Sequence, residues 1–151
     1  MLPEKGQAGK PPVWRGDSDH MTIVLTNVTT ATALEKVIRE QKAGTVFLAQ
    51  EMHTVSDRCD DALKRWHKVL GVRGVLSPSQ PISRGGTSGG CGVFARRQVP
   101  LLDAPGLPDE IPEPPKARFS AALLGGLLNG PVLFVSVYLI SGLSLTGPNA
   151  D

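Results

Sequence analysis

The chain has 151 residues, enough for one domain with a buried core. Its formal net charge at pH 7 is only +2, so no strong overall field draws it to nucleic acid or to a membrane surface. The apolar runs are too short to span a bilayer, and residues 1–16 lack the apolar core of a signal peptide. We therefore expect no membrane association and an intracellular protein, nuclear or cytoplasmic, that is not secreted.

Residues 1–20 are expected to form a flexible leader, because Gly and Pro interrupt them and no periodicity is present. The leader contains Asp17, Ser18, Asp19 and His20, which could form an acid–imidazole site, although a solvated terminal segment explains them more simply. The two cysteines, Cys59 and Cys91, lie far apart without metal-type spacing, and we expect free thiols.

The next segment, 21–50, has the pattern of a β-α-β unit. Residues 22–27 and 45–50 are predicted strands, and residues 32–42 a helix, with Thr32 and Glu35 forming its capping box. Parallel pairing would bring the carboxyl ends of both strands to one edge of the sheet. Asn27 and Glu51 are therefore expected to lie close together.

Each of these two residues also has a structural interpretation. Asn27 could be a turn residue that bonds its own backbone, and Glu51 could pair on the surface with an arginine such as Arg84. The position of Glu51 still favours chemistry, because it directly follows an apolar strand and precedes His53 by two residues.

Residues 54–70 form the clearest predicted helix. Trp66 lies on its apolar face and is expected in the core, whereas His67 is expected on a solvated face. Thr54 or Asp57 can cap the start, and Gly71 ends the helix.

A glycine-rich segment lies between the next two predicted strands, 72–76 and 91–97. Residues 77–90 are expected to form a loop, and their Gly-rich end could hold phosphate or, more simply, lead into a hairpin strand that needs close backbone contact. Arg84, Arg96 and Arg97 are expected to place positive charge around it.

The last part of the chain predicts a proline-rich loop and a hairpin. Residues 98–116 are the loop, and strands at 117–124 and 132–140 pair across a turn that contains Asn129-Gly130. Tyr138 lies at the far end of the second strand. We expect an α/β fold: one mixed sheet of these six strands, with both helices packed together on one face.

Four motifs occur in a characteristic order. They are Val24-Leu25-Thr26-Asn27-Val28, Gln50-Glu51-Met52-His53, Thr87-Ser88-Gly89-Gly90-Cys91-Gly92-Val93-Phe94 and Val135-Ser136-Val137-Tyr138-Leu139. Over residues 21–143 the chain resembles the N-terminal half of an endonuclease/exonuclease/phosphatase domain, the fold of DNase-I-like nucleases, AP endonucleases and LINE-type retrotransposon endonucleases.

The resemblance implies a hydrolase that acts as a metal-dependent phosphodiesterase on DNA. It implies that Glu51 ligates Mg²⁺ or Mn²⁺, that Asn27 orients groups at the phosphate or metal, and that Tyr138 bonds the phosphate. His53 is expected near these residues but not in direct contact with the metal or phosphate. The same fold also contains phosphatases of phospholipids or inositol phosphates, and this half does not separate the two.

The resemblance also implies a fragment: half of a four-layer α/β sandwich, with residues 144–151 as a truncated tail. The family's Gly-Asp-x-Asn motif and Asp-His pair do not follow Tyr138, and Ser18-Asp19-His20 resembles the pair at the wrong end of the chain. We therefore expect the chain to be inactive alone. The alternative is a non-enzymatic remnant or interaction module.

A fragment of a two-sheet fold is expected to leave one sheet face uncovered. We expect that face to contain Ile23, Leu25, Phe47, Phe94 and Val135, and to promote aggregation or self-association.

Overall fold

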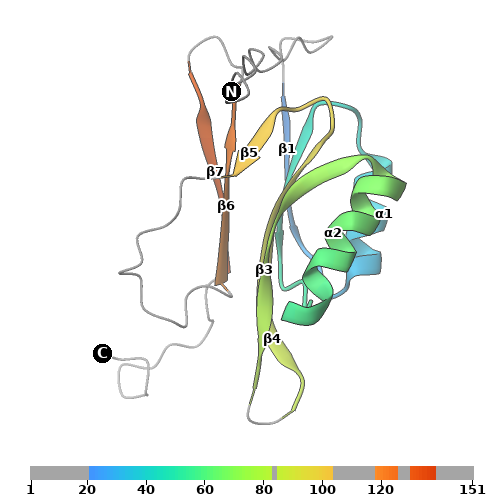
Figure 1. The fold of residues 1–151 in the computed structure, drawn as a ribbon, viewed down its shortest axis with the longest axis vertical. Coiled ribbons are helices and arrows are strands. Elements are labelled where there is room, and N and C mark those ends of the chain that lie inside the picture. The colour runs from blue at the N-terminus through green and yellow to red at the C-terminus, as the bar shows by residue number, and fades with distance from the viewer. Residues whose placement is uncertain (1–20, 83–84, 104–117, 126–129, 139–151) are drawn as a thin grey trace, which may run out of the picture.

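The computed structural model describes residues 21–82, 85–103, 118–125 and 130–138. They form three layers: two helices, a four-stranded sheet and a three-stranded sheet (Figure 1). The predicted α/β fold, with a mixed sheet and both helices on one face, is confirmed. The strands expected in one sheet are divided between two. Within the described part of the chain, neither helix has the length and apolar character needed to cross a membrane.

The four-stranded sheet and the helices come from the first two thirds of the chain. The elements are β1 (Thr22–Asn27), α1 (Ala31–Glu40), β2 (Thr45–Gln50), α2 (Ser56–Leu70), β3 (Val72–Pro81) and β4 (Thr87–Arg96). The strand order is β1-β2-β4-β3. β1 and β2 are parallel, and the other two pairs are antiparallel.

The second sheet consists of β5 (Leu101–Asp103), β6 (Phe119–Leu124) and β7 (Val132–Val137), all antiparallel and in that order. The predicted hairpin is thus present as β6 and β7. β5 lies inside the segment 98–116, which was expected to be loop. Residues 104–116 of that segment are outside the described residues, as are Asn129 and residues 144–151.

The core on the helix side contains aromatic side chains from three elements. Phe47 of β2, Trp66 of α2 and Phe94 of β4 are buried there, with Leu34 and Ile38 of α1. The rings of Trp66 and Phe94 meet edge to face, with centroids 5.3 Å apart. The predicted core position of Trp66 is confirmed.

Glycine makes room for the Phe94 ring. A Cβ at Gly74, which pairs with Phe94, would lie 2.4 Å from its Cδ1, and a Cβ at Gly92 would lie 2.3 Å from the same ring. Both glycines are therefore required by close packing rather than by a turn.

A second core lies between the two sheets. Val46, Leu48, Val93 and Ala95 of the first sheet pack there against Ala122, Leu124 and Phe134 of the second. The expectation that Phe47 and Phe94 lie on an uncovered sheet face is therefore wrong, because helices cover one face of β2 and β4 and the second sheet covers the other. Ile23 and Leu25 do remain exposed, at 47% and 72%, because they lie on the edge strand β1.

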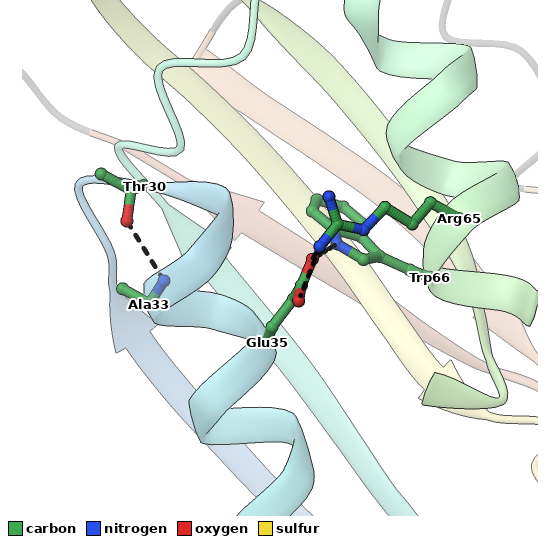
Figure 2. A network of polar contacts seen from close by, with 5 residues as sticks. All are labelled: Thr30, Ala33, Glu35, Arg65 and Trp66. Carbon is green, nitrogen blue, oxygen red and sulfur yellow. Dashed lines mark hydrogen bonds and ion pairs between the residues drawn. The ribbon is translucent and has the colours of Figure 1, made fainter. Parts of the chain in front are cut away.

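The starts of both helices differ from the predicted caps. Thr30, not Thr32, caps α1: its Oγ1 accepts a hydrogen bond from the Ala33 N–H at 3.1 Å (Figure 2). Glu35 instead joins the helices, accepting from Trp66 Nε1 at 3.1 Å and pairing with Arg65 at 3.1 Å (Figure 2). α2 begins after Val55 without a side-chain cap, and Gly71 ends it with φ 63° as predicted.

Residues 77–90 are mostly strand rather than loop. β3 and β4 form a long hairpin whose register continues from Val72↔Arg96 to Pro81↔Thr87. Proline is tolerated in β3 because this strand is at the sheet edge. An edge strand has a neighbouring strand on one side only, so a proline without an N–H removes fewer hydrogen bonds between strands there. The prolines and serines at 77–81 thus belong to the edge strand β3, whereas Gly89 and Gly90 belong to the inner strand β4.

Candidate functional site

The site lies where β1 and β2 end. These strands are parallel and in register, with Asn27 opposite Gln50, and the ladder continues through a bond of 2.9 Å from the Val28 N–H to the Gln50 carbonyl. Glu51 follows immediately. Asn27 and Glu51 therefore leave the sheet at the same edge.

Tyr138 reaches this edge from the second sheet. It directly follows β7, which is fixed across β2 by two side-chain bonds: Ser136 Oγ donates to the Ala49 carbonyl at 2.8 Å, and Gln50 Nε2 donates to the Val137 carbonyl. The Tyr138 N–H donates to the Arg118 carbonyl at 2.7 Å, and the Arg118 guanidinium lies 5.5 Å from the centre of the phenol ring.

The three side chains meet in one hydrogen-bonded group. Side-chain hydrogen bonds from Tyr138 first, and from Asn27 second, lower the pKa of Glu51 below its ordinary value of 4.5, and the charge of His53 acts in the same direction. The same bond with Glu51 raises the pKa of Tyr138 above 10.0. Glu51 is thus an ionised carboxylate that accepts from two neutral donors.

The backbone at this carboxylate is unusual. Glu51 and His53 have φ of 54° and 50°, and they are the only non-glycine residues with positive φ in the described part of the chain. Left-handed backbone costs about 1–2 kcal/mol for a residue with a Cβ. Such strain is concentrated at functional sites, where the surrounding structure maintains it.

The hairpin of β3 and β4 holds the strained loop. The Met52 and His53 N–H groups donate to the Gly90 and Gly89 carbonyls at 3.1 and 3.3 Å. On the other side of the loop, Ser79 N–H donates to the Thr54 carbonyl at 2.8 Å. The Gly-rich motif therefore contacts the loop after Glu51 through the carbonyl groups of Gly89 and Gly90.

Two of the three positive charges predicted around the Gly-rich segment, those of Arg96 and Arg97, lie elsewhere. The Arg96 guanidinium donates to the carbonyls of Ile38, Leu70 and Gln41 at 2.6, 2.7 and 3.0 Å, where both helices end. Arg97 donates to the His67 carbonyl. Arg84 lies outside the described residues, as do Ser18, Asp19 and His20.

His67 and the two cysteines have structural contacts and are not members of the hydrogen-bonded group around Glu51. His67 is half-buried rather than fully solvated, with Nδ1 3.3 Å from the Val72 carbonyl oxygen. Cys59 and Cys91 are free and buried, as expected. Burial raises the pKa of the Cys59 thiol and raises that of Cys91 to about 11, so neither is a thiolate near neutral pH.

A cleft of about 840 Å³ opens beside the loop, between the start of α1 and the side of α2 that faces it. Its lining includes His53, Thr54, Thr30, Arg58 and Trp66. The cleft thus begins next to Glu51. His53 and Thr54 belong to the loop after Glu51 and also line the cleft.

The donor set suits a hard cation. It consists of the Glu51 carboxylate, the Asn27 amide and the Tyr138 phenol, and Mg²⁺ takes one or two carboxylates with water and phosphate oxygens as its other ligands. No cluster of three or more His, Cys, Asp or Glu side chains suited to a metal occurs among the described residues. The described site therefore offers one anionic ligand.

Sequence reasoning identified Asn27, Glu51 and Tyr138, and the structure brings them together; their catalytic roles stay predictions. The motifs included Gln50, Ser136 and Thr87 but did not predict their contacts: Gln50 and Ser136 fix β7 across β2, and Thr87 contacts His53. A polar residue at each buried strand end was the available signal. Comparison of the chain with models of protein families, with curated protein sequences and with solved structures gave no match.

Proposed function

We propose that residues 21–138 form the N-terminal half of a magnesium-dependent phosphodiesterase domain that acts on DNA, with Asn27, Glu51 and Tyr138 as its contribution to the active site. One observation carries this proposal: three polar side chains from the ends of three separate strands converge at one sheet edge, where hydrogen bonding with Tyr138 and Asn27 lowers the pKa of the Glu51 carboxyl. The two residues with left-handed backbone in this loop support it, because such strain is concentrated at functional sites.

Within this proposal, each residue has one task. Glu51 holds the divalent cation, because its lowered pKa keeps the carboxylate available at neutral pH. Asn27 and Tyr138 donate to anionic oxygen, first that of Glu51 and then that of a phosphate. The cation, when bound, supplies charge stabilisation at the scissile phosphate.

The proposal includes inactivity of the 151-residue chain by itself. The resemblance assigns a Gly-Asp-x-Asn motif and an Asp-His pair to the second half of such a domain, and neither motif follows Tyr138 in this sequence. We expect a metal site that binds weakly and no cleavage of plasmid or abasic-site DNA above background.

Metal binding tests the proposal without requiring turnover. Free Mn²⁺ is measured by its electron paramagnetic resonance signal in the presence of the protein. We expect one weak site that is lost in Glu51→Gln, because the amide removes the anionic ligand. Glu40→Gln is the matched control, since Glu40 is exposed at the end of α1. Equal binding by wild type and Glu51→Gln would refute the metal role of Glu51.

Substrate class is tested by binding in the same way. We expect a single-stranded or abasic oligonucleotide to perturb the NMR signal of Tyr138 in the presence of Mg²⁺. An inositol phosphate that perturbs this signal while the oligonucleotide does not would instead assign the site to the phosphatases of the fold.

A second proposal concerns association, and one specific observation favours it. The outer face of the second sheet, away from the four-stranded sheet, contains Leu102, Leu133, Val135 and Val137, each 41–53% exposed. The pairing Leu102↔Leu123↔Leu133 makes these side chains neighbours across the three strands. We propose that a second copy of the chain packs on this face, because an uncharged apolar surface meets no repulsion from its own copy.

A further inference from the structure

The imidazole of His53 is fixed although it is exposed to solvent. Its Nδ1 lies 2.8 Å from the Thr87 carbonyl oxygen and 3.3 Å from Thr87 Oγ1. A carbonyl oxygen only accepts hydrogen bonds, so Nδ1 carries the proton of this bond. The contact joins the loop after Glu51 to the first residue of β4.

This contact adds nothing to either hydrophobic core. The neighbouring Met52 side chain is buried under the helices and anchors the loop there, whereas the His53 ring lies outside. Its backbone has φ 50°, a left-handed conformation that histidine and asparagine adopt more often than most residues with a Cβ and that glycine adopts freely. Packing therefore does not explain this histidine, and backbone preference alone would be met equally well by asparagine or glycine.

The orientation of Glu51 offers an explanation. Glu51 and His53 are the two strained residues of one loop, and Met52 between them is bonded to Gly90. Gly90 cannot carry a side chain easily, because its Cβ would lie 3.3 Å from the His53 backbone nitrogen. The ring bond to Thr87 adds a side-chain tether to these backbone bonds and fixes the end of the loop.

We propose that His53 is a positioning residue: its ring, tethered to Thr87, holds the strained loop so that the Glu51 carboxylate stays bonded to Tyr138 and Asn27. The Thr87-Ser88-Gly89-Gly90 motif is the partner of this loop, which assigns it a role in orienting a metal ligand. The consequence for metal affinity rests on the proposed function above; the positioning itself does not.

The single tyrosine of the chain makes the positioning measurable. In protein labelled with ¹³C at the tyrosine ζ carbon, one signal reports whether Tyr138 donates to Glu51. The reference for a lost bond is the signal of Glu51→Gln. Spectra of all variants are recorded at the same pH.

Three substitutions at one position separate the ring contact from backbone preference. His53→Ala removes the ring, and we expect the Tyr138 signal to move most of the way to its position in Glu51→Gln. His53→Gly removes the ring and relieves the backbone strain, and we expect the same movement. His53→Asn keeps an N–H donor and suits positive φ, so we expect the signal to stay near wild type.

His67→Ala is the matched control, because its Nδ1 also lies near a backbone carbonyl, that of Val72, at the other end of α2. It should leave the Tyr138 signal unchanged. A wild-type signal in His53→Ala or in His53→Gly would overturn the proposal, and so would a fully moved signal in His53→Asn.

Mn²⁺ binding to the same proteins separates this proposal from the proposed function. We expect His53→Ala to weaken binding about tenfold, as is usual for residues that orient a metal ligand. Absence of binding in the wild type would refute the metal site while leaving the result at Tyr138 intact.

Discussion

Glu51 combines three properties that are seldom found together at a strand end. Its backbone is left-handed, its carboxylate accepts from two neutral side chains, and its pKa is lowered as a result. A lowered pKa stabilises the folded state above the ordinary value of 4.5, and this contribution is lost as the pH falls through the folded value. Glu51 is largely solvated, so the effect on overall stability is small.

Tyr138 titrates in the opposite sense. Its pKa is raised because the phenol donates to Glu51, so the stabilisation is present below the unfolded pKa and lost as the pH rises through the folded value. We expect phenolate absorbance to appear at higher pH than for free tyrosine, and Glu51→Gln to shift the curve back toward 10.0. A titration curve that Glu51→Gln leaves unchanged would contradict the bond between these residues.

At the scale of elements, the carboxyl ends of the helices depend on one arginine. Arg96 donates to carbonyls of both α1 and α2 and to that of Gln41, and its positive charge lies where the helix dipoles are negative. This explains the position of Arg96: its charge was expected near the Gly-rich segment but lies at the other end of β4.

We expect Arg96→Met to lower the free energy of unfolding by about 2–3 kcal/mol, because several charge-assisted bonds are lost together. Arg97→Met removes one exposed bond and should cost at most about 1 kcal/mol. Urea unfolding of the two variants measures the difference. Equal losses would show that Arg96 contributes no more than a surface arginine.

The strands and helices with a clear period could be predicted from the sequence. β1, β2 and α2 follow from apolar spacing, and the meeting of Asn27 with Glu51 follows from parallel pairing. Residues 77–90 were expected to be loop because Gly, Pro and Ser suggest turns. The prolines instead lie on the edge strand β3, which tolerates them, and Gly89 and Gly90 lie in β4 where it bonds the loop after Glu51. The contact of His53 with Thr87 depends on this hairpin, so composition could not reveal it.

At the scale of the whole molecule, two opposite surfaces have different characters. Helices shield one side of the four-stranded sheet, and the second sheet shields the other, but nothing among the described residues covers the outer face of the second sheet (Figure 1). An uncovered apolar sheet of several hundred Å² favours association. We therefore expect association through this outer face. Phe47 of β2 and Phe94 of β4, which the sequence placed on the associating face, are buried.

We expect a concentration-dependent dimer in analytical ultracentrifugation, and Val135→Lys should weaken it at least tenfold because it places charge on the outer face. Val69→Lys is the control, since Val69 is also an exposed valine but lies on α2, far from that face. A monomer at every concentration, or equal effects of both lysines, would contradict association through the second sheet.

The account depends most on a single site shared by Asn27, Glu51 and Tyr138, and titration of the protein with Mg²⁺ tests this most directly. The ζ-carbon signal of Tyr138 is followed in wild type, Glu51→Gln and Glu40→Gln. We expect a saturable shift in wild type and in Glu40→Gln and none in Glu51→Gln, because the phenol senses the cation through the Glu51 carboxylate. A Tyr138 signal that does not respond to Mg²⁺ in the wild type, or that responds equally in Glu51→Gln, would contradict the account.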